Sequence, residues 1–292
     1  MGFWASALGV LAPLTAHAGV AEVFYERAVM AAADQRCRLF TPEISAALNA
    51  GRAQARGAAL RSGIEADVLS KVESRAHDKA YAASCTSPDI ATAAGRIRAA
   101  YEPFSRQLRQ VYPGDFASWT AERTTAQRAP VWTLSQPVSF GWDRMTFGMA
   151  GQGPAQALLA VASFADGARP YTARLVIRDT ARSPRPYLDA RRADAKGRLP
   201  LAARITPRVY TRSFMAEHSQ PADGGLAPAG TKNAIAYRFP ANAATALANL
   251  DPREAVEVEF VFQGAQGDVV RWAYVEVGDF AAGQAFLSLA QR

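Results

Sequence analysis

The chain has 292 residues, of which 49% are hydrophobic and 20% are charged, and its formal net charge is +7 at pH 7. This apolar content is ample for a packed core and excludes disorder of the whole chain, and the length suits one large domain or two ordinary ones. No hydrophobic run reaches the length of a transmembrane helix, so we expect a protein that is not transmembrane.

The first 18 residues have most features of a secretory signal peptide. Residues 2–15 are uncharged and apolar, and Ala16-His17-Ala18 fits the small-x-small cleavage rule. The usual positive start is missing, because no Lys or Arg precedes Arg27, so an apolar N-terminal arm is the alternative. We expect residues 1–18 to be a cleaved signal peptide and the mature protein to be periplasmic or secreted.

Two helix starts of nearly the same sequence follow the only two cysteines of the chain. Thr41-Pro42-Glu43-Ile44 comes after Cys37, and Ser87-Pro88-Asp89-Ile90 comes after Cys85. Each start combines a hydroxyl N-cap, a proline at the first helical position and an acid in the first turn, and each of these meets a separate need of a helix N-terminus. The repetition predicts a duplicated αα-hairpin, a four-helix module with helices over roughly 20–38, 42–61, 66–83 and 88–111.

Short connections make consecutive helices antiparallel, so the first and third helices point the same way and both cysteines lie at one end of the module. We therefore predict a Cys37–Cys85 disulfide, which closes a loop of about 48 residues and contributes on the order of 4 kcal/mol. Two buried free thiols in a cytosolic protein are the alternative. The second helix carries a face of small residues that allows close approach of a neighbouring helix: Ile44, Ala47, Leu48, Gly51, Ala55 and Ala58.

The period of the hydrophobic residues changes from near 3.6 to 2 after a polar stretch, residues 116–130. We interpret this stretch as a linker between the helical module, residues 19–115, and a β-rich domain, residues 131–292. Asp166-Gly167 between two apolar runs predicts a hairpin. A second hairpin over 256–277, a short helix over 241–250 and a final helix capped by Asp279 complete an antiparallel sandwich or open barrel. The predicted fold class is α+β.

Candidates for catalysis are few. His218 lies beside Glu217 and near Asp223, where a general base or a metal site can in principle be assembled, but the polarity of a surface loop explains the same residues. Glu257 and Glu259 share a strand face, a spacing that suits a pair of glycosidase carboxylates, but we interpret this face as the solvent face of an antiparallel sheet. The sequence has no phosphate-binding, dinucleotide-binding or nucleophile-elbow motif, and we predict neither a cofactor nor a metal.

Charge is unevenly distributed in the second half. Residues 169–212 contain 12 basic and three acidic residues, a net charge of +9. Such a segment can hold an anionic partner, or it can be compensated by acids of a neighbouring sheet. Nucleic acid is not expected, because no known nucleic-acid-binding motif is present. The predicted anion-binding residues are Arg174, Arg178, Arg182, Arg185, Arg191, Arg192 and Arg198.

These observations favour an exported, non-enzymatic cell-envelope protein that binds an anionic envelope component or a protein partner, with the basic segment as the expected contact. One alternative is a hydrolase of a cell-wall or polysaccharide substrate that uses His218, Glu217 and Asp223. Another is a structural or assembly subunit that uses the small-residue helix face.

Overall fold

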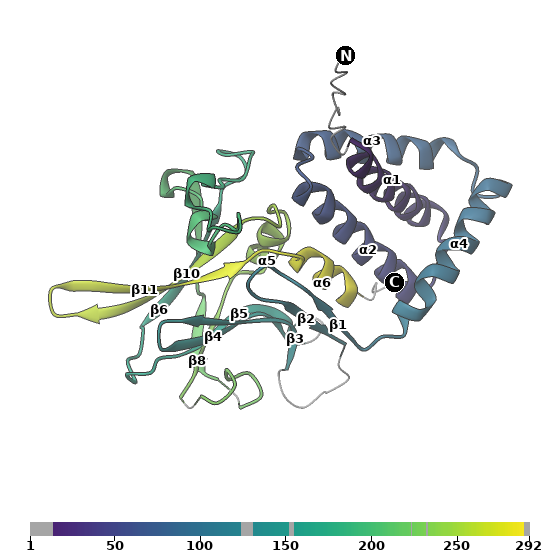
Figure 1. The fold of residues 1–292 in the computed structure, drawn as a ribbon. Helices are drawn as coiled ribbons and strands as arrows, with labels where there is room; N and C mark the ends of the chain where they lie inside the picture. The colour runs from purple at the N-terminus through teal and green to yellow at the C-terminus, as the bar shows by residue number, and fades with distance from the viewer. Residues whose placement is uncertain (1–13, 124–130, 152–154, 223, 232, 289–292) are drawn as a thin grey trace, which may run out of the picture.

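A computed structural model of the chain describes residues 14–123, 131–151, 155–222, 224–231 and 233–288. The described residues form four N-terminal helices, two antiparallel sheets and two further helices, which confirms the predicted α+β class (Figure 1). The predicted signal peptide falls mostly outside these residues, and α1 (Leu14–Cys37) runs through its expected cleavage position. Across the described helices, none combines the length and the apolar character needed to cross a bilayer.

Both proline-initiated starts begin helices as predicted. The hydroxyls of Thr41 and Ser87 accept hydrogen bonds from the backbone N–H groups of Ile44 and Ile90. These starts open α2 (Pro42–Arg61) and α4 (Pro88–Ser105), and α3 (Ala66–Ala82) lies between them. The Cys37–Cys85 disulfide is present at the C-terminal ends of α1 and α3, with a Cα–Cα distance of 5.6 Å.

Two segments differ from the expected element boundaries. The fourth helix ends at Ser105 rather than near 111, because Pro103 removes a helical hydrogen bond and the chain then forms β1 (Arg109–Tyr112). Trp119–Glu122, which we expected within the linker, forms β2 and pairs with both β1 and β3. Trp119 and Ala121 are buried on one face of this strand, so they add to the core. Residues 124–130 of the expected linker lie outside the described residues.

The β-rich part is a sandwich of a seven-stranded and a four-stranded antiparallel sheet. The larger sheet has the order β1-β2-β3-β4-β5-β9-β8 and the smaller one β11-β10-β6-β7. The remaining strands are β3 (Trp132–Phe140), β4 (Asp143–Ala150), β5 (Ala157–Ser163), β6 (Thr172–Arg178), β7 (Thr211–Met215), β8 (His218–Pro221), β9 (Ile235–Arg238), β10 (Ala255–Gly264) and β11 (Gly267–Glu276).

The hairpin predicted around Asp166-Gly167 is not formed. Gly167 has the expected positive φ of 71°, but β5 pairs with β4 and β9, whereas β6 pairs with β10 and β7. The connection therefore crosses from one sheet to the other, and both strands are almost entirely buried and contribute to the same core. The hairpin of β10 and β11 is confirmed and projects from the body of the sandwich (Figure 1).

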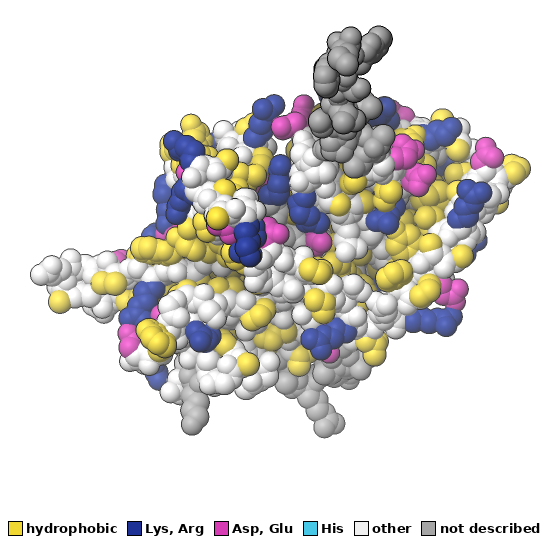
Figure 2. Space-filling model, viewed as in Figure 1, with side chains coloured by type: hydrophobic (Ala, Val, Ile, Leu, Met, Phe, Trp, Pro, Cys, Tyr) yellow, Lys and Arg dark blue, Asp and Glu magenta, His cyan; other side chains and the backbone are white. Residues whose placement is uncertain are grey.

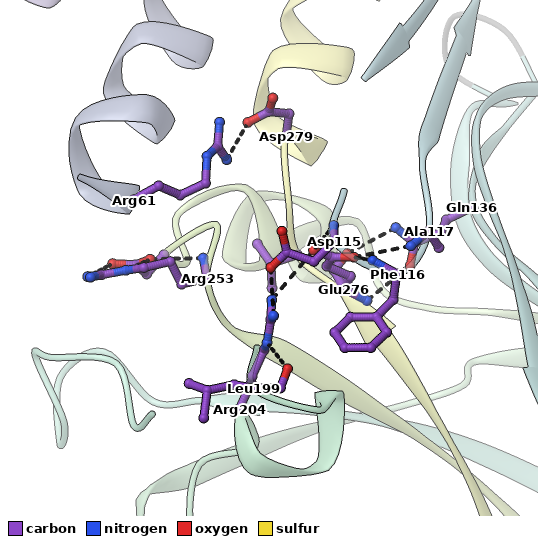
Figure 3. Close-up of polar contacts among 12 residues, drawn as sticks. Arg61, Asp115, Phe116, Ala117, Gln136, Leu199, Arg204, Arg253, Glu276 and Asp279 are labelled. Atoms are coloured by element: carbon purple, nitrogen blue, oxygen red, sulfur yellow. Dashed lines mark hydrogen bonds and ion pairs between the residues drawn. The ribbon is translucent and has the colours of Figure 1, made fainter. Parts of the chain in front are cut away.

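Helix α6 (Phe280–Leu287) connects the sandwich to the helical module, while α5 (Ala241–Ala248) packs against β5. Phe280 packs edge-to-face on Trp119, and Ala50 of α2 belongs to the same buried cluster as the sandwich core. Asp279 stands at the N-cap position of α6, but its side chain caps nothing. Its Oδ1 instead accepts a hydrogen bond from Arg61 Nη1 of α2 at 3.0 Å (Figure 3). Asp279, which we expected to cap the helix, therefore forms an ion pair with the helical module.

The loop between β1 and β2 closes around Glu276 at the end of β11. The backbone N–H groups of Asp115, Phe116 and Ala117 all donate to the Glu276 carboxylate at 2.8–3.2 Å (Figure 3). Arg204 from the long β6–β7 connection adds an ion pair of 2.6 Å with Asp115. This arginine belongs to the basic run of the sequence, and its side chain is buried in the fold rather than available to a partner.

Candidate functional site

A largely apolar cleft of about 640 Å³ lies within the helical module, between α1, α2 and α4. Only Ile90 and Ala94 of α4 are buried, both in its N-terminal half, so the C-terminal half of this helix forms an open wall. Figure 2 shows hydrophobic side chains gathered between α2 and α4. The walls are formed by Val23, Met30, Ala47, Ala50, Ile97, Tyr101 and Phe104.

Arg27 adds a charged group to this largely apolar wall. Arg27 of α1 donates a hydrogen bond from Nη1 to the carbonyl oxygen of Gly51 in α2, at 2.7 Å. Tyr101 of α4 packs directly over Gly51, where a Cβ would overlap its hydroxyl. Burial raises the pKa of Tyr101, and the charge and hydrogen bond of Arg27 partly offset this effect. Arg27 is thus held half-buried beside the apolar surface.

The charges that line the cleft are predominantly positive. Arg27, Lys79 and Arg96 face it together with a single carboxylate, Glu26. Among the described residues, none of the three cations has a carboxylate within ion-pair distance, in contrast to Arg52 and Arg61 on the opposite side of α2. An unpaired guanidinium at an apolar surface binds carboxylates and phosphates well, because it presents several donors in a fixed plane.

The base of the cleft is rigid. Tyr112 of β1 and Phe286 of α6 form its floor, and both are buried. Beneath them Arg123 stacks on the Phe286 ring at 3.9 Å and donates hydrogen bonds to the backbone carbonyls of Phe286 and Ser105. Burial lowers the pKa of Arg123, and neighbouring Tyr112 and Glu43 oppose this shift. Arg123 thereby fixes the end of α4 relative to α6.

Sequence reasoning found one component of this site and missed the rest. The small-residue face of α2 was predicted, and Gly51 does allow the close approach of Tyr101. Tyr101 and Phe104 have the helical spacing of ordinary core positions in the helix expected over 88–111. Arg27 is not part of any motif in the sequence. The absence of buried residues in the second half of α4 is a tertiary feature that no local pattern reports.

The predicted anion-binding arginines occupy different environments. Arg178 is buried at 4% exposure in an ion pair of 2.7 Å with Glu254, and Arg174 pairs with buried Glu259, so neither presents a free charge. The other five lie on the exposed connection between β6 and β7. Figure 2 shows Lys and Arg side chains gathered over this part of the molecule. Four of these make surface ion pairs at 3.0–3.8 Å, and such pairs are weak in water: Arg182, Arg185, Arg191 and Arg198.

Glu257 and Glu259 do not lie on a solvent face, contrary to our interpretation of the alternating pattern. Both are buried at no more than 5% exposure, because Arg208 from the β6–β7 connection covers them and pairs with both carboxylates. Burial raises the pKa of Glu257. Burial alone would also raise that of Glu259, but hydrogen bonds from Arg174 and Arg208 outweigh it and lower the pKa. These acids compensate part of the basic segment.

The structure places His218 on a strand rather than in a loop. This residue is exposed on β8, at the edge of the larger sheet, where its Cα pairs with Arg238. Glu217 follows the end of β7, and Asp223 lies outside the described residues. Among the described residues there is no group of three or more His, Cys, Asp or Glu that could hold a metal ion. The hydrolase and assembly-subunit alternatives stay predictions without added support.

No protein-family model, no curated protein and no solved structure matches this chain. The geometry of the cleft and the chemistry of its residues are therefore the basis on which a function is assigned.

Proposed function

We propose that this protein is a non-enzymatic binding protein of the cell envelope, and that the cleft between α1, α2 and α4 holds an anionic amphiphile of the fatty-acid class. The observation that carries the proposal is Arg27, which has no carboxylate partner among the described residues and lines a largely apolar cleft of about 640 Å³. This volume falls within the usual range of small-molecule sites, about 300–1,000 Å³.

The two parts of such a ligand match the two kinds of surface in the cleft. An alkyl chain lies against Met30, Ile97 and Phe104, which releases water from apolar surface on both sides. The carboxylate reaches Arg27, and Lys79 and Arg96 add positive potential. A neutral apolar ligand leaves this charge unused, so the proposal is specific to an anion.

Two features support an address outside the cytoplasm as part of the same proposal. The first 18 residues have the composition of a signal peptide, and a disulfide joins the only two cysteines. In that compartment the five exposed arginines of the β6–β7 connection would attract an anionic envelope surface, an attraction that salt weakens: Arg182, Arg185, Arg191, Arg192 and Arg198.

Fluorescence titration with cis-parinaric acid, a fatty acid whose emission rises in apolar surroundings, tests the assignment. Ala100 and Ala99 are exposed neighbours on α4, but only Ala100 lines the cleft. We expect saturable binding to the wild type and to Ala99→Trp, and at least a 10-fold weaker affinity for Ala100→Trp, whose indole fills the entrance. No saturable binding, or equal loss in the two variants, contradicts the proposal.

A further inference from the structure

A second pocket, of about 590 Å³, lies at the end of the sandwich that points away from the helical module. It is enclosed by the turn between β3 and β4, the connection between β5 and β6, and residues 229–231 and 233. Unlike the helical cleft, it is lined mainly by polar groups, which include Ser163, Thr231 and Asn233. Neither His218 nor Glu217, the described candidates for catalysis, falls in it.

Trp142 is the most exposed large hydrophobic residue among those the structure describes, at 88%. It occupies the second position of a two-residue turn, after Gly141 with φ of 62°, which is the arrangement of a type II′ hairpin turn. The short turn places Trp142 at the pocket, where it is part of the lining. A turn position normally favours a small polar residue, so an exposed indole here has no evident role in folding.

The charge in the described part of the lining comes from two arginines. Arg144 and Arg169 are both exposed, and among the described residues neither has a carboxylate within ion-pair distance. The acids nearby are already paired, because Arg271 binds Asp143 at 3.3 Å and Asp166 at 3.2 Å. Asp143 also accepts a hydrogen bond from the backbone N–H of Ala165 at 2.9 Å, which anchors the β5–β6 connection to the β3–β4 turn. The pocket is therefore a fixed, positively charged structure.

We infer that this pocket binds a carboxylated pyranose, the repeating unit of an acidic glycan. The indole face of Trp142 stacks on the C–H face of the sugar ring, Arg144 and Arg169 bind the carboxylate, and the polar lining accepts and donates hydrogen bonds to hydroxyls. The indole by itself suits a membrane interface equally well. The polar lining of a concave pocket favours the sugar.

Calorimetric titration with trigalacturonic acid and with its fully methyl-esterified form tests this inference, because esterification removes the negative charges and adds only a methyl group at each carboxylate. We expect the acid to bind the wild type and the ester to bind at least 10-fold more weakly. Trp142→Ala, Arg144→Gln and Arg169→Gln should each weaken binding of the acid about 10-fold. Two matched controls should leave the affinity for the acid unchanged. They are Trp272→Ala, at a half-exposed tryptophan outside the pocket, and Arg109→Gln, at an exposed arginine outside it.

All three pocket side chains are exposed, so the melting temperatures of the variants should equal that of the wild type. Absence of binding to the wild type at millimolar trigalacturonic acid, equal binding of the ester, or indifference to Trp142→Ala overturns the inference. Binding to vesicles of anionic phospholipid that depends on Trp142, without binding of the sugar acid, also overturns it and assigns the indole to a membrane surface.

Discussion

Arg61 in the last turn of α2 and Asp279 at the start of α6 form an ion pair of 3.0 Å, although 218 positions separate them in the chain. Asp279 is nearly buried, at 7% side-chain exposure, whereas Arg61 reaches the surface. This contact connects the disulfide-linked helices to the sandwich. It also fixes the helix that supplies Phe286 to the floor of the cleft.

Replacement of Arg61 by Gln should lower the free energy of unfolding by about 1–3 kcal/mol, because Asp279 then stays buried without its cation. Arg52→Gln is the matched control on the same helix, since its pair with Glu73 is exposed and should contribute less than about 1 kcal/mol. Urea denaturation of both variants measures the difference. Equal losses would show that the inter-module pair has no special role.

Removal of the disulfide should destabilise the helical module. Cys37→Ser with Cys85→Ser opens a loop spanning 48 positions and should cost about 2–4 kcal/mol in the chain-entropy account. Thermal denaturation with and without reductant measures this, and the double variant should no longer respond to reductant. Mass spectrometry of a non-reduced digest is the direct check, and two alkylatable thiols in the oxidised protein would refute the pairing.

Gly114 should be intolerant of any side chain. A Cβ there would overlap the backbone oxygen of Ala117 and the carboxylate of Glu276, around which this loop closes. We expect Gly114→Ala to lose about 2–4 kcal/mol of stability. Gly95→Ala, on an open face of α4, should instead gain up to about 1 kcal/mol from helix propensity. Denaturant unfolding of the two variants compares them, and similar values would mean that the loop is not held as described.

Asp166 should titrate at unusually low pH. Hydrogen bonds from Arg271 and from the backbone of Ala168 lower its pKa from 3.8 to about 2. A carboxyl group whose pKa is lower in the folded state than in the unfolded state stabilises the fold at any pH above its ordinary pKa. This contribution is lost as the pH falls through the folded-state pKa of about 2. Carboxyl NMR titration of wild type and Arg271→Gln checks the sign, since the variant should return the midpoint toward 3.8. Arg144→Gln is the control, and in this variant the titration midpoint of Asp166 should stay low.

The sequence was most informative where local chemistry determines structure. Thr41-Pro42 and Ser87-Pro88 predicted two helix starts and, through them, the position of the disulfide. Asp166-Gly167 predicted the turn conformation correctly but not the strand pairing. A turn specifies local backbone angles, whereas the choice of sheet depends on which distant strand buries β6.

Both candidate sites depend on contacts that no local pattern encodes. The cleft exists because no residue in the second half of α4 is fully buried, and Arg208, which covers Glu257, comes from a connection 49 positions earlier in the chain. The alternation of hydrophobic and acidic residues along β10 therefore predicted a strand, but it did not show that other parts of the chain cover the face that carries the acids. The number of basic residues in the sequence was likewise a poor guide to the free positive charge, since Arg178 and Arg204 form ion pairs with the buried acids Glu254 and Glu276.

The ratio of affinities for cis-parinaric acid and its neutral methyl ester, measured for the wild type and for Arg27→Gln, tests the central claim most directly. Hydrogen bonds to a charged group contribute about 1.5–3 kcal/mol, so the wild type should prefer the acid by about 10- to 100-fold. Arg27→Gln should remove most of this preference and leave only the part that Lys79 and Arg96 supply, while ester binding stays the same. Equal preference for the acid in both proteins would contradict the assignment of the cleft to an anionic amphiphile held by Arg27.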